Sequence, residues 1–295
     1  MDLYLQVLVN GILLGGLYAA VAVGFSLVWG VMGIINVTHG SLIMAGAYIT
    51  YVLHDVHHLD PFLTIPVAMA ALFLFGYLLQ NMLINRVLSG GVLATLIITF
   101  GLDHMIANLA LLIFSADERG AAPNYARIVL HAGELLVPYV RLLIFLSAVG
   151  LVTAVYLLLT YSKIGRAIRA VALNTHAAQL TGVDLTRTYS LTFAIGAALA
   201  GAAGSLLATT YTISPEMGGH YLLKAFVITV IGGLGNLAGV LFGAVLLGVA
   251  ETFGALFFGT GYQEAIGVAL LLIVLALRPQ GLLGNRFFGE GSGGL

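Results

Sequence analysis

The sequence has no cysteine and very few charged residues. The missing cysteines exclude a disulfide framework, thiolate metal sites and a cysteine nucleophile. Charged residues make up 8% of the chain, whereas soluble domains carry about 25%. Hydrophobic residues make up 60%, and the formal net charge of -1 favours no nucleic-acid partner. The composition therefore predicts an integral membrane protein surrounded by the lipid bilayer.

The motifs of common enzyme classes are also missing. The chain contains no G-x-S-x-G, no H-E-x-x-H and no phosphate-binding G-x-x-x-x-G-K-[ST]. Because each membrane-spanning helix takes about 20 residues, 295 residues leave no room for a soluble catalytic domain. We predict that the protein is not an enzyme and binds no cofactor. Any energy from nucleotide hydrolysis would come from another chain.

What the chain does contain is a series of long apolar runs. They predict an all-α, polytopic membrane protein with about eight or nine transmembrane helices in a single domain, residues 1–295, and no strands. The first run lacks the basic flank and cleavage site of a signal peptide, so it is expected to be a mature span. The run over 222–258 is too long for one crossing, and Ile231–Asn236 is expected to break it. The other spans are expected at about 5–31, 33–53, 62–84, 92–114, 139–161, 188–210 and 265–277.

The charges between these runs predict the orientation, because Lys and Arg concentrate at cytoplasmic flanks. The chain begins with the acidic Asp2 and has no basic residue near its N-terminus, which is therefore expected in the periplasm. Arg278 and Arg286 follow the last run and predict a cytoplasmic C-terminus. The connections that carry Glu216 and Glu264 are expected outside, where Arg119, Arg127 and Arg141 are exceptions to the charge rule.

Residues 162–187 form the longest internal segment that is too polar for lipid. The segment holds Lys163, Arg166, Arg169 and Arg187 against one acid, so it is expected in the cytoplasm. One face of its first part carries apolar residues at helical spacing, namely Ile164, Ala167, Ile168, Val171 and Ala172.

A second short helix is expected over residues 176–181, with Thr175 as its N-cap and Gly182 closing it. Asp184 is expected to cap the next span. Two interpretations of the whole segment remain open, an amphipathic helix on the lipid headgroups and a helix that a cytoplasmic partner grips.

Glycines at close spacing predict tight helix packing. Gly11, Gly15 and Gly16 lie in the first span. Gly235, Gly239 and Gly243 recur at every fourth residue and are expected on one helix face.

Polar residues inside apolar runs are the candidates for a translocation path, since such groups must face protein or water. Asp103, next to His104, either makes a structural hydrogen bond to a neighbouring helix or serves in a proton relay. Asn36 and His39 flank a break that either borders the path or is a plain turn between spans. Asn236, in the break at 231–236, has the same two interpretations. Glu251 either pairs at the outer rim or serves transport. No second His, Asp or Glu lies three or four residues from His39, so no metal site is predicted.

Four stretches resemble the branched-chain amino acid ABC importer permeases. Asn10–Tyr48 contains an N-G-x-x-x-G-x-x-Y-A run followed by I-N-x-x-H-G, and Lys163–Val183 contains G-R-A-x-R-A followed by A-x-x-x-G-[IV]. Lys224–Glu251 and the terminal RPQGLLG, Arg278–Gly284, are similar to the C-terminal half of that family.

The resemblance implies a permease subunit of a bacterial inner-membrane importer for branched-chain or related small amino acids. Its implied partners are a second homologous permease, two cytoplasmic ATP-binding subunits and a periplasmic substrate-binding protein. By position, Gly165, Arg166, Arg169, Ala177 and Gly182 would belong to the ATPase-coupling loop. Leu173 and Asn174 stand where family members often carry acidic residues.

Three alternatives to this function stay open at this point. Relatives that carry urea or short amides make those compounds alternative cargo. A stand-alone carrier could couple protons through Asp103 or His104, and a membrane scaffold would transport nothing.

Overall fold

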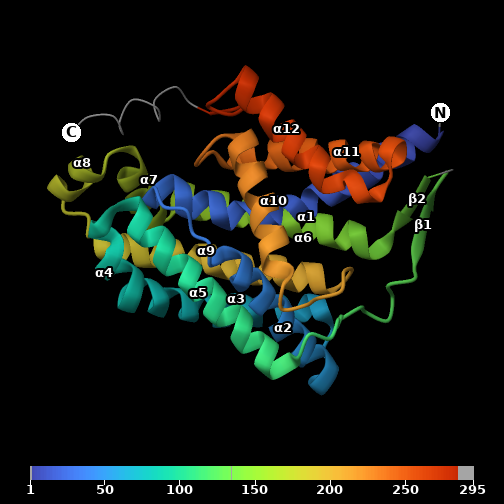
Figure 1. Cartoon of the computed structure of the whole chain (residues 1–295), viewed down its shortest axis with the longest axis horizontal. Coiled ribbons are helices and arrows are strands. Elements are labelled where there is room, and N and C mark those ends of the chain that lie inside the picture. The colour runs from blue at the N-terminus through green and yellow to red at the C-terminus, as the bar shows by residue number, and fades with distance from the viewer. Residues whose placement is uncertain (1, 134, 285–295) are drawn as a thin grey trace.

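The computed structural model describes residues 2–133 and 135–284, and these residues are mostly helical (Figure 1). The long helices are α1 (Asp2–Met32), α2 (His39–His57), α3 (Pro61–Leu79), α5 (Gly91–Phe114), α6 (Tyr139–Tyr161), α9 (Leu185–Ala208), α10 (Met217–Gly232), α11 (Leu237–Phe258) and α12 (Gln263–Leu277). The shorter elements are the π-helix η1 (Gln80–Ile84), α4 (Asn85–Val87), the 3-10 helices η2 (Leu88–Gly90) and η3 (Thr260–Tyr262), α7 (Lys163–Leu173) and α8 (Thr175–Leu180).

Seven helical stretches of the described chain are long and apolar enough to cross a membrane. They are Leu3–Met32, Pro61–Val87, Gly91–Phe114, Tyr139–Tyr161, Leu185–Ala208, Leu237–Phe258 and Thr260–Leu277. The shorter apolar α10 and the more polar α2 lie among them. The prediction of an all-α polytopic membrane protein is confirmed. The predicted break is also confirmed, because α10 ends at Gly232 and α11 begins at Leu237.

The helices α1 and α9 form the centre of the bundle. In each, 89% of the most apolar stretch is buried, whereas only 17% is buried in α5 and in α12. Figure 1 shows α1 crossing the middle of the molecule, with α11 and α12 on one side of it and α2, α3 and α5 on the other. The apolar outer faces of α5 and α12 are thus available to lipid or to another subunit, as expected for a helix at the edge of a membrane bundle.

The first span packs closely on α11 through small residues. Gly11 and Gly15 of α1 face the backbone of Val249 and Val245, and Gly248 faces the backbone of α1 in return. Without side chains at these positions the two helices approach to backbone contact. The predicted tight packing of the first span is confirmed.

The predicted glycine face after the break is wrong in one position. Gly235 precedes α11 and lies against Gly30, at the end of α1. Gly239 and Gly243 do lie in α11, and both face Gly232 at the end of α10.

The absence of strands was also predicted wrongly. Residues of the connection between α5 and α6 form an antiparallel hairpin, β1 (Val129–Ala132) and β2 (Leu135–Pro138). Two short apolar runs are separated here by Gly133, whose positive φ of 66° suits a tight turn. The Gln6 side chain bonds both backbone groups of Leu136, at 2.8 Å each, and so ties the hairpin to α1.

A second contact holds the connection between α5 and α6 at Tyr125. The Tyr125 hydroxyl donates a hydrogen bond to Asp60 Oδ2 at 2.8 Å. Burial and this hydrogen bond both raise the pKa of Tyr125, so the phenol stays protonated.

The two ends of the bundle carry different elements. The start of α1 and the hairpin lie at one end, and α7 and α8 lie at the other (Figure 1). This arrangement agrees with the predicted alternation of the spans. Residues 285–295, with Arg286, lie outside the described residues. The placement of both termini relative to the membrane stays a prediction.

Candidate functional site

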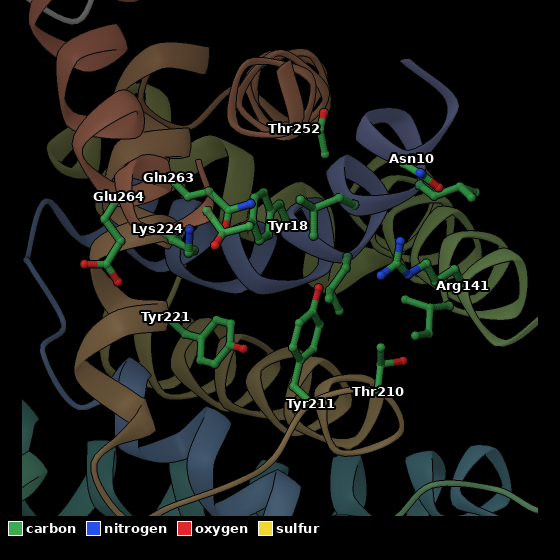
Figure 2. Close-up of a pocket in the computed structure, with 16 residues that line it drawn as sticks. Asn10, Tyr18, Arg141, Thr210, Tyr211, Tyr221, Lys224, Thr252, Gln263 and Glu264 are labelled. Atoms are coloured by element: carbon green, nitrogen blue, oxygen red, sulfur yellow. The ribbon is translucent and has the colours of Figure 1, made fainter. Parts of the chain in front are cut away.

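A pocket of about 540 Å³ lies between α1, α6, α10 and the connections that follow α9 and α11 (Figure 2). Its volume is within the range of about 300–1,000 Å³ that small-molecule sites occupy. The wall residues come from segments far apart in the sequence, so the pocket exists only in the folded bundle.

One face of α1 forms a wall of the pocket. Asn10, Leu13, Leu14, Leu17 and Tyr18 line it at helical spacing. The stripe has an apolar middle and a polar group at each end, which lie about 12 Å apart along the helix. Such a wall offers both an aliphatic contact and two polar contacts to a small ligand.

A buried ion pair lies beside this wall. Lys224 of α10 donates to Glu251 Oε1 of α11 at 2.7 Å, and the Tyr18 hydroxyl donates to Glu251 Oε2 at 2.5 Å. The Lys224 ammonium also lies 4.8 Å from the centre of the Tyr18 ring, in cation–π range. Glu251 is only 1% exposed. Because a buried charge needs its partner, this network holds α1, α10 and α11 together on one side of the pocket.

Glu251 was predicted either to pair at the outer rim or to serve transport. The structure gives it a partner in the pocket wall. Lys224, which borders the predicted outer end of its span, lies midway along α10 with its side chain 17% exposed.

Arg141 lines another side of the pocket, in the first turn of α6. Figure 2 shows its guanidinium pointing toward the middle of the pocket. Among the described residues, no hydrogen bond or ion pair engages this side chain, whereas Glu264 on the opposite side bonds His220 Nδ1 at 3.0 Å. Of the two cationic side chains in the wall, Lys224 is paired with Glu251, whereas no described carboxylate pairs with Arg141.

The pocket lies near the end of the bundle that is predicted to face the periplasm. Thr210 and Tyr211 follow α9, and Thr260, Gly261 and Gln263 lie where α11 passes into α12. Both connections were predicted outside. The segment with α7 and α8 lies at the other end (Figure 1).

The four residues predicted for the translocation path do not line this pocket. Asn36 and His39 are buried at the connection between α1 and α2, where His39 Nε2 lies 2.9 Å from the carbonyl oxygen of Val21. Asn236 caps α11, since its Oδ1 accepts from the Gly239 amide at 3.1 Å. Asn236 thus acts as a helix cap, whereas Asn36 Oδ1 and His39 Nδ1 are buried without a hydrogen-bond partner among the described residues. Their part in a translocation path stays a prediction.

Asp103 lies on α5, away from the main pocket. It lines a separate hollow of about 340 Å³ with His104 and Glu216. Its carboxylate is 3.8 Å from His104 Nδ1, and no described residue of a neighbouring helix bonds it, contrary to the expected structural hydrogen bond. The His104 side chain is 63% exposed, so the pair lies at the edge of the bundle.

The predicted coupling segment is folded onto the end of α6. Ser162 caps α7 by accepting from the Gly165 amide at 2.8 Å. Gly165 itself is buried, and a methyl group there would overlap the carbonyl oxygens of Leu158 and Leu159. Only glycine allows α7 to lie this close to α6.

Two arginines strengthen the same junction. Arg169 Nη2 donates to the Thr160 carbonyl at 3.1 Å, and Arg166 Nη1 donates to the Tyr161 carbonyl at 3.4 Å. The last carbonyls of a helix lack partners within the helix, and cations are favourable there. Both arginines thus bond their own chain and leave their remaining surface exposed.

The helical pattern of this segment was predicted largely correctly. Ile168 and Val171 are buried, but Ile164, predicted on the same face, is 43% exposed because Gly165 takes the position against α6. Gly182 closes α8 with a φ of 84°, as predicted. Asp184 caps α9, also as predicted, by accepting from the Arg187 amide at 3.1 Å.

The predicted cap of the second helix was wrong. Asn174 caps α8 by accepting from the Ala177 amide at 2.9 Å, while Thr175 is the first helical residue and donates to the Val171 carbonyl. An amide oxygen competes well for a cap position, so the Asn before the Thr took it. Ala177 is exposed.

Sequence reasoning missed Arg141 and Tyr18 as site residues. Arg141 was predicted only as a basic residue on an outer flank, against the rule that Lys and Arg concentrate at cytoplasmic flanks. That departure from the rule was the signal that could have identified it. A basic residue on a predicted outer flank has no topological reason to be there.

Comparison with known proteins agrees with this architecture. Residues 7–275 match the family model described as branched-chain amino acid transport system / permease component. The BraD permease protein of Pseudomonas aeruginosa is 35% identical over 96% of both chains. The LivH permease protein of Salmonella typhimurium is 31% identical, again over 96% of both chains. The LivM permease protein of the same organism is 28% identical over 90% of this chain and 68% of its own length. No solved structure matches the chain.

A match over nearly the whole chain leaves no large part of the bundle outside the comparison. The chain therefore belongs to the branched-chain amino acid transport system permease family.

Proposed function

We propose that this protein is a permease subunit of an ABC importer that moves branched-chain or related small amino acids across the bacterial inner membrane. The proposal rests on family membership and on the names of the relatives, which are high-affinity branched-chain amino acid permeases. Separate ATP-binding subunits would supply the energy, since the sequence has no nucleotide-binding motif of its own.

The observation that carries the proposal is the form of the α7–α8 segment. It is a pair of short helices whose tips expose Leu173 at 82% and Leu180 at 77%. Exposed leucines on a polar, basic segment favour a protein partner over a free solvent loop. In our proposal these tips insert into a groove of a cytoplasmic ATPase.

The junction with α6 explains how such a partner would act on the membrane part. Because Gly165, Arg166 and Arg169 hold α7 against the end of α6, a push on α7 is transmitted to a helix about 35 Å long. The other end of that helix carries Arg141 in the pocket wall. Closure of the ATPases would therefore move one wall of the pocket.

The proposed complex contains a second, homologous permease and a periplasmic substrate-binding protein. Similarity to both LivH and LivM proteins supports pairing between two different permeases of one family. In this arrangement residues 162–187 and the C-terminus face the cytoplasm, and the N-terminus and the pocket face the periplasm.

The test is uptake by proteoliposomes that contain this chain together with the ATPases and second permease encoded beside it, and its binding protein. We expect leucine uptake that needs internal ATP and the binding protein. Uptake driven by a pH gradient without ATPases would instead indicate a proton-coupled carrier. Uptake of urea or amides without leucine would keep the importer and overturn its cargo.

Loss of the ATPase contact is the matching test of the α7–α8 segment. Leu173→Asp with Leu180→Asp should abolish copurification of the ATPases, because two charges would enter an apolar groove. Thr181→Asp, an exposed neighbour on the same turn, is the control and should leave copurification intact. Equal copurification in all variants would contradict the proposed docking.

A further inference from the structure

We infer that the pocket beside α1 binds an α-amino acid, with the carboxylate on Arg141 and the aliphatic side chain on the α1 stripe. The inference rests on the proposed function and adds to it the groups that recognise the cargo.

The charge balance of the pocket assigns the carboxylate. Lys224 is neutralised by the buried Glu251 at 2.7 Å, and Glu264 bonds His220. Arg141 remains as the positive charge that no described residue balances, and it points into the pocket (Figure 2). A guanidinium binds a carboxylate through two parallel hydrogen bonds that the opposite charges strengthen. Urea and neutral amides carry no charge and cannot form this charge-assisted pair.

Neutral oxygens beside Arg141 suit the ammonium group. In an α-amino acid the ammonium and carboxylate share one carbon, so both must bind at the same side of the pocket. Asn10 and Thr210 line the wall and lie on the Arg141 side in Figure 2. Their amide and hydroxyl oxygens accept hydrogen bonds without cancelling the arginine charge, as an acidic residue there would do.

The middle of the α1 stripe suits a branched aliphatic side chain. Leu13, Leu14 and Leu17 face the pocket together with Ile144 of α6. This apolar surface begins one helical turn from Asn10, within reach of a side chain on a cargo held at Arg141. Each methylene that such a wall accommodates favours the larger cargo about tenfold or more.

The contact between Arg141 and the carboxylate has a second consequence, because Arg141 lies on α6. Arg141 belongs to the helix whose other end is bound to α7, so a carboxylate held by Arg141 is held by the part that the ATPases would move. The cargo would lose its main charged contact when α6 shifts.

The experiment measures binding of labelled leucine to the assembled complex in nanodiscs without the binding protein, so that the permeases alone select. Competitors are leucinamide, which lacks the carboxylate, and 4-methylpentanoate, which lacks the ammonium. We expect the unmodified complex to prefer leucine over leucinamide. Arg141→Gln should weaken leucine binding by roughly 10- to 100-fold and abolish that preference. Arg141→Lys should keep the preference with weaker binding.

The control is Arg127→Gln, an exposed arginine of the connection between α5 and α6 that does not line the pocket. It should change neither affinity nor preference. Basal ATP hydrolysis and subunit stoichiometry identify variants that fail to assemble. If Arg141→Gln fails to assemble, Arg141→Lys carries the test. A leucine preference that survives Arg141→Gln, or no saturable leucine binding to the unmodified complex, overturns the inference. ATP-driven uptake by the unmodified complex would still stand, so the two failures are distinguishable.

Discussion

The two ends of α6 differ in how strongly the chain constrains them. At the α7 end, Gly165 allows backbone contact and three side chains bond the junction, so the turn has one geometry. At the other end, Arg141 projects into a pocket of about 540 Å³. A rigid junction transmits displacement, and an open pocket leaves room for a ligand and for movement. One helix thus combines a fixed connection with a variable wall.

The largest effect is expected at the rigid end. Gly165→Ala places a methyl group against the carbonyl oxygens of Leu158 and Leu159, so α7 must move away from α6. We expect ATP-driven uptake to fall at least tenfold while the protein still inserts in the membrane. Uptake assays in proteoliposomes measure this effect.

Gly150→Ala is the matched control, because Gly150 lies in α6 with nothing within 4 Å of the added methyl. It should leave uptake unchanged. Equal behaviour of the two variants would mean that the junction does not transmit force.

The next effect concerns the ion pair at the pocket end. Glu251→Gln leaves the Lys224 ammonium buried without its counter-charge, which costs about 3–5 kcal/mol of unfolding free energy. The measurement is unfolding of the purified protein in detergent.

A double-mutant cycle sharpens this result. Adding Lys224→Met to Glu251→Gln should recover part of the loss, since no unpaired charge remains. Glu264→Gln, at an exposed carboxylate, should stay within about 0.5 kcal/mol of the unmodified protein. Strictly additive losses would show that the two groups do not interact.

A smaller effect is expected at the arginines of the junction. Arg169→Ala removes one donor from the end of α6, and the exposed position limits its contribution. We expect uptake to fall a few-fold and amide hydrogen exchange in α7 to accelerate. Arg187→Ala, an exposed arginine beyond α8, should change neither quantity. If amide hydrogen exchange in α7 is unchanged after Arg169→Ala, Gly165 alone would account for the stability of the junction.

The smallest effect is expected far from both ends of α6. Asp103→Asn removes a carboxylate whose neighbour His104 is 63% exposed at the edge of the bundle. Uptake should remain within about twofold of the unmodified complex, because an ATP-driven path needs no proton relay there. A loss of uptake that depends on pH would favour the proton-coupled carrier.

Much of the fold was predictable because the membrane imposes it. Long apolar runs must be helical to satisfy their backbone groups in lipid, and most observed helices lie close to the predicted spans. The second span is an exception, because α2 begins at His39 rather than at residue 33 and is not among the seven helices long and apolar enough to cross a membrane. The hairpin at Val129–Pro138 was missed, because two four-residue runs carry too little periodicity to be distinguished from a loop. The coupling segment was predictable in outline because its polarity and its caps are local signals.

The membrane class, the order of the helices and the polar segment at 162–187 follow from local signals, since each depends on hydrophobicity and capping within a short window of the sequence. The network of Tyr18, Lys224 and Glu251 and the position of Arg141 at a pocket follow from the packing of the helices instead. Those pairings join residues up to 233 positions apart, and no local pattern encodes which faces of distant helices will meet.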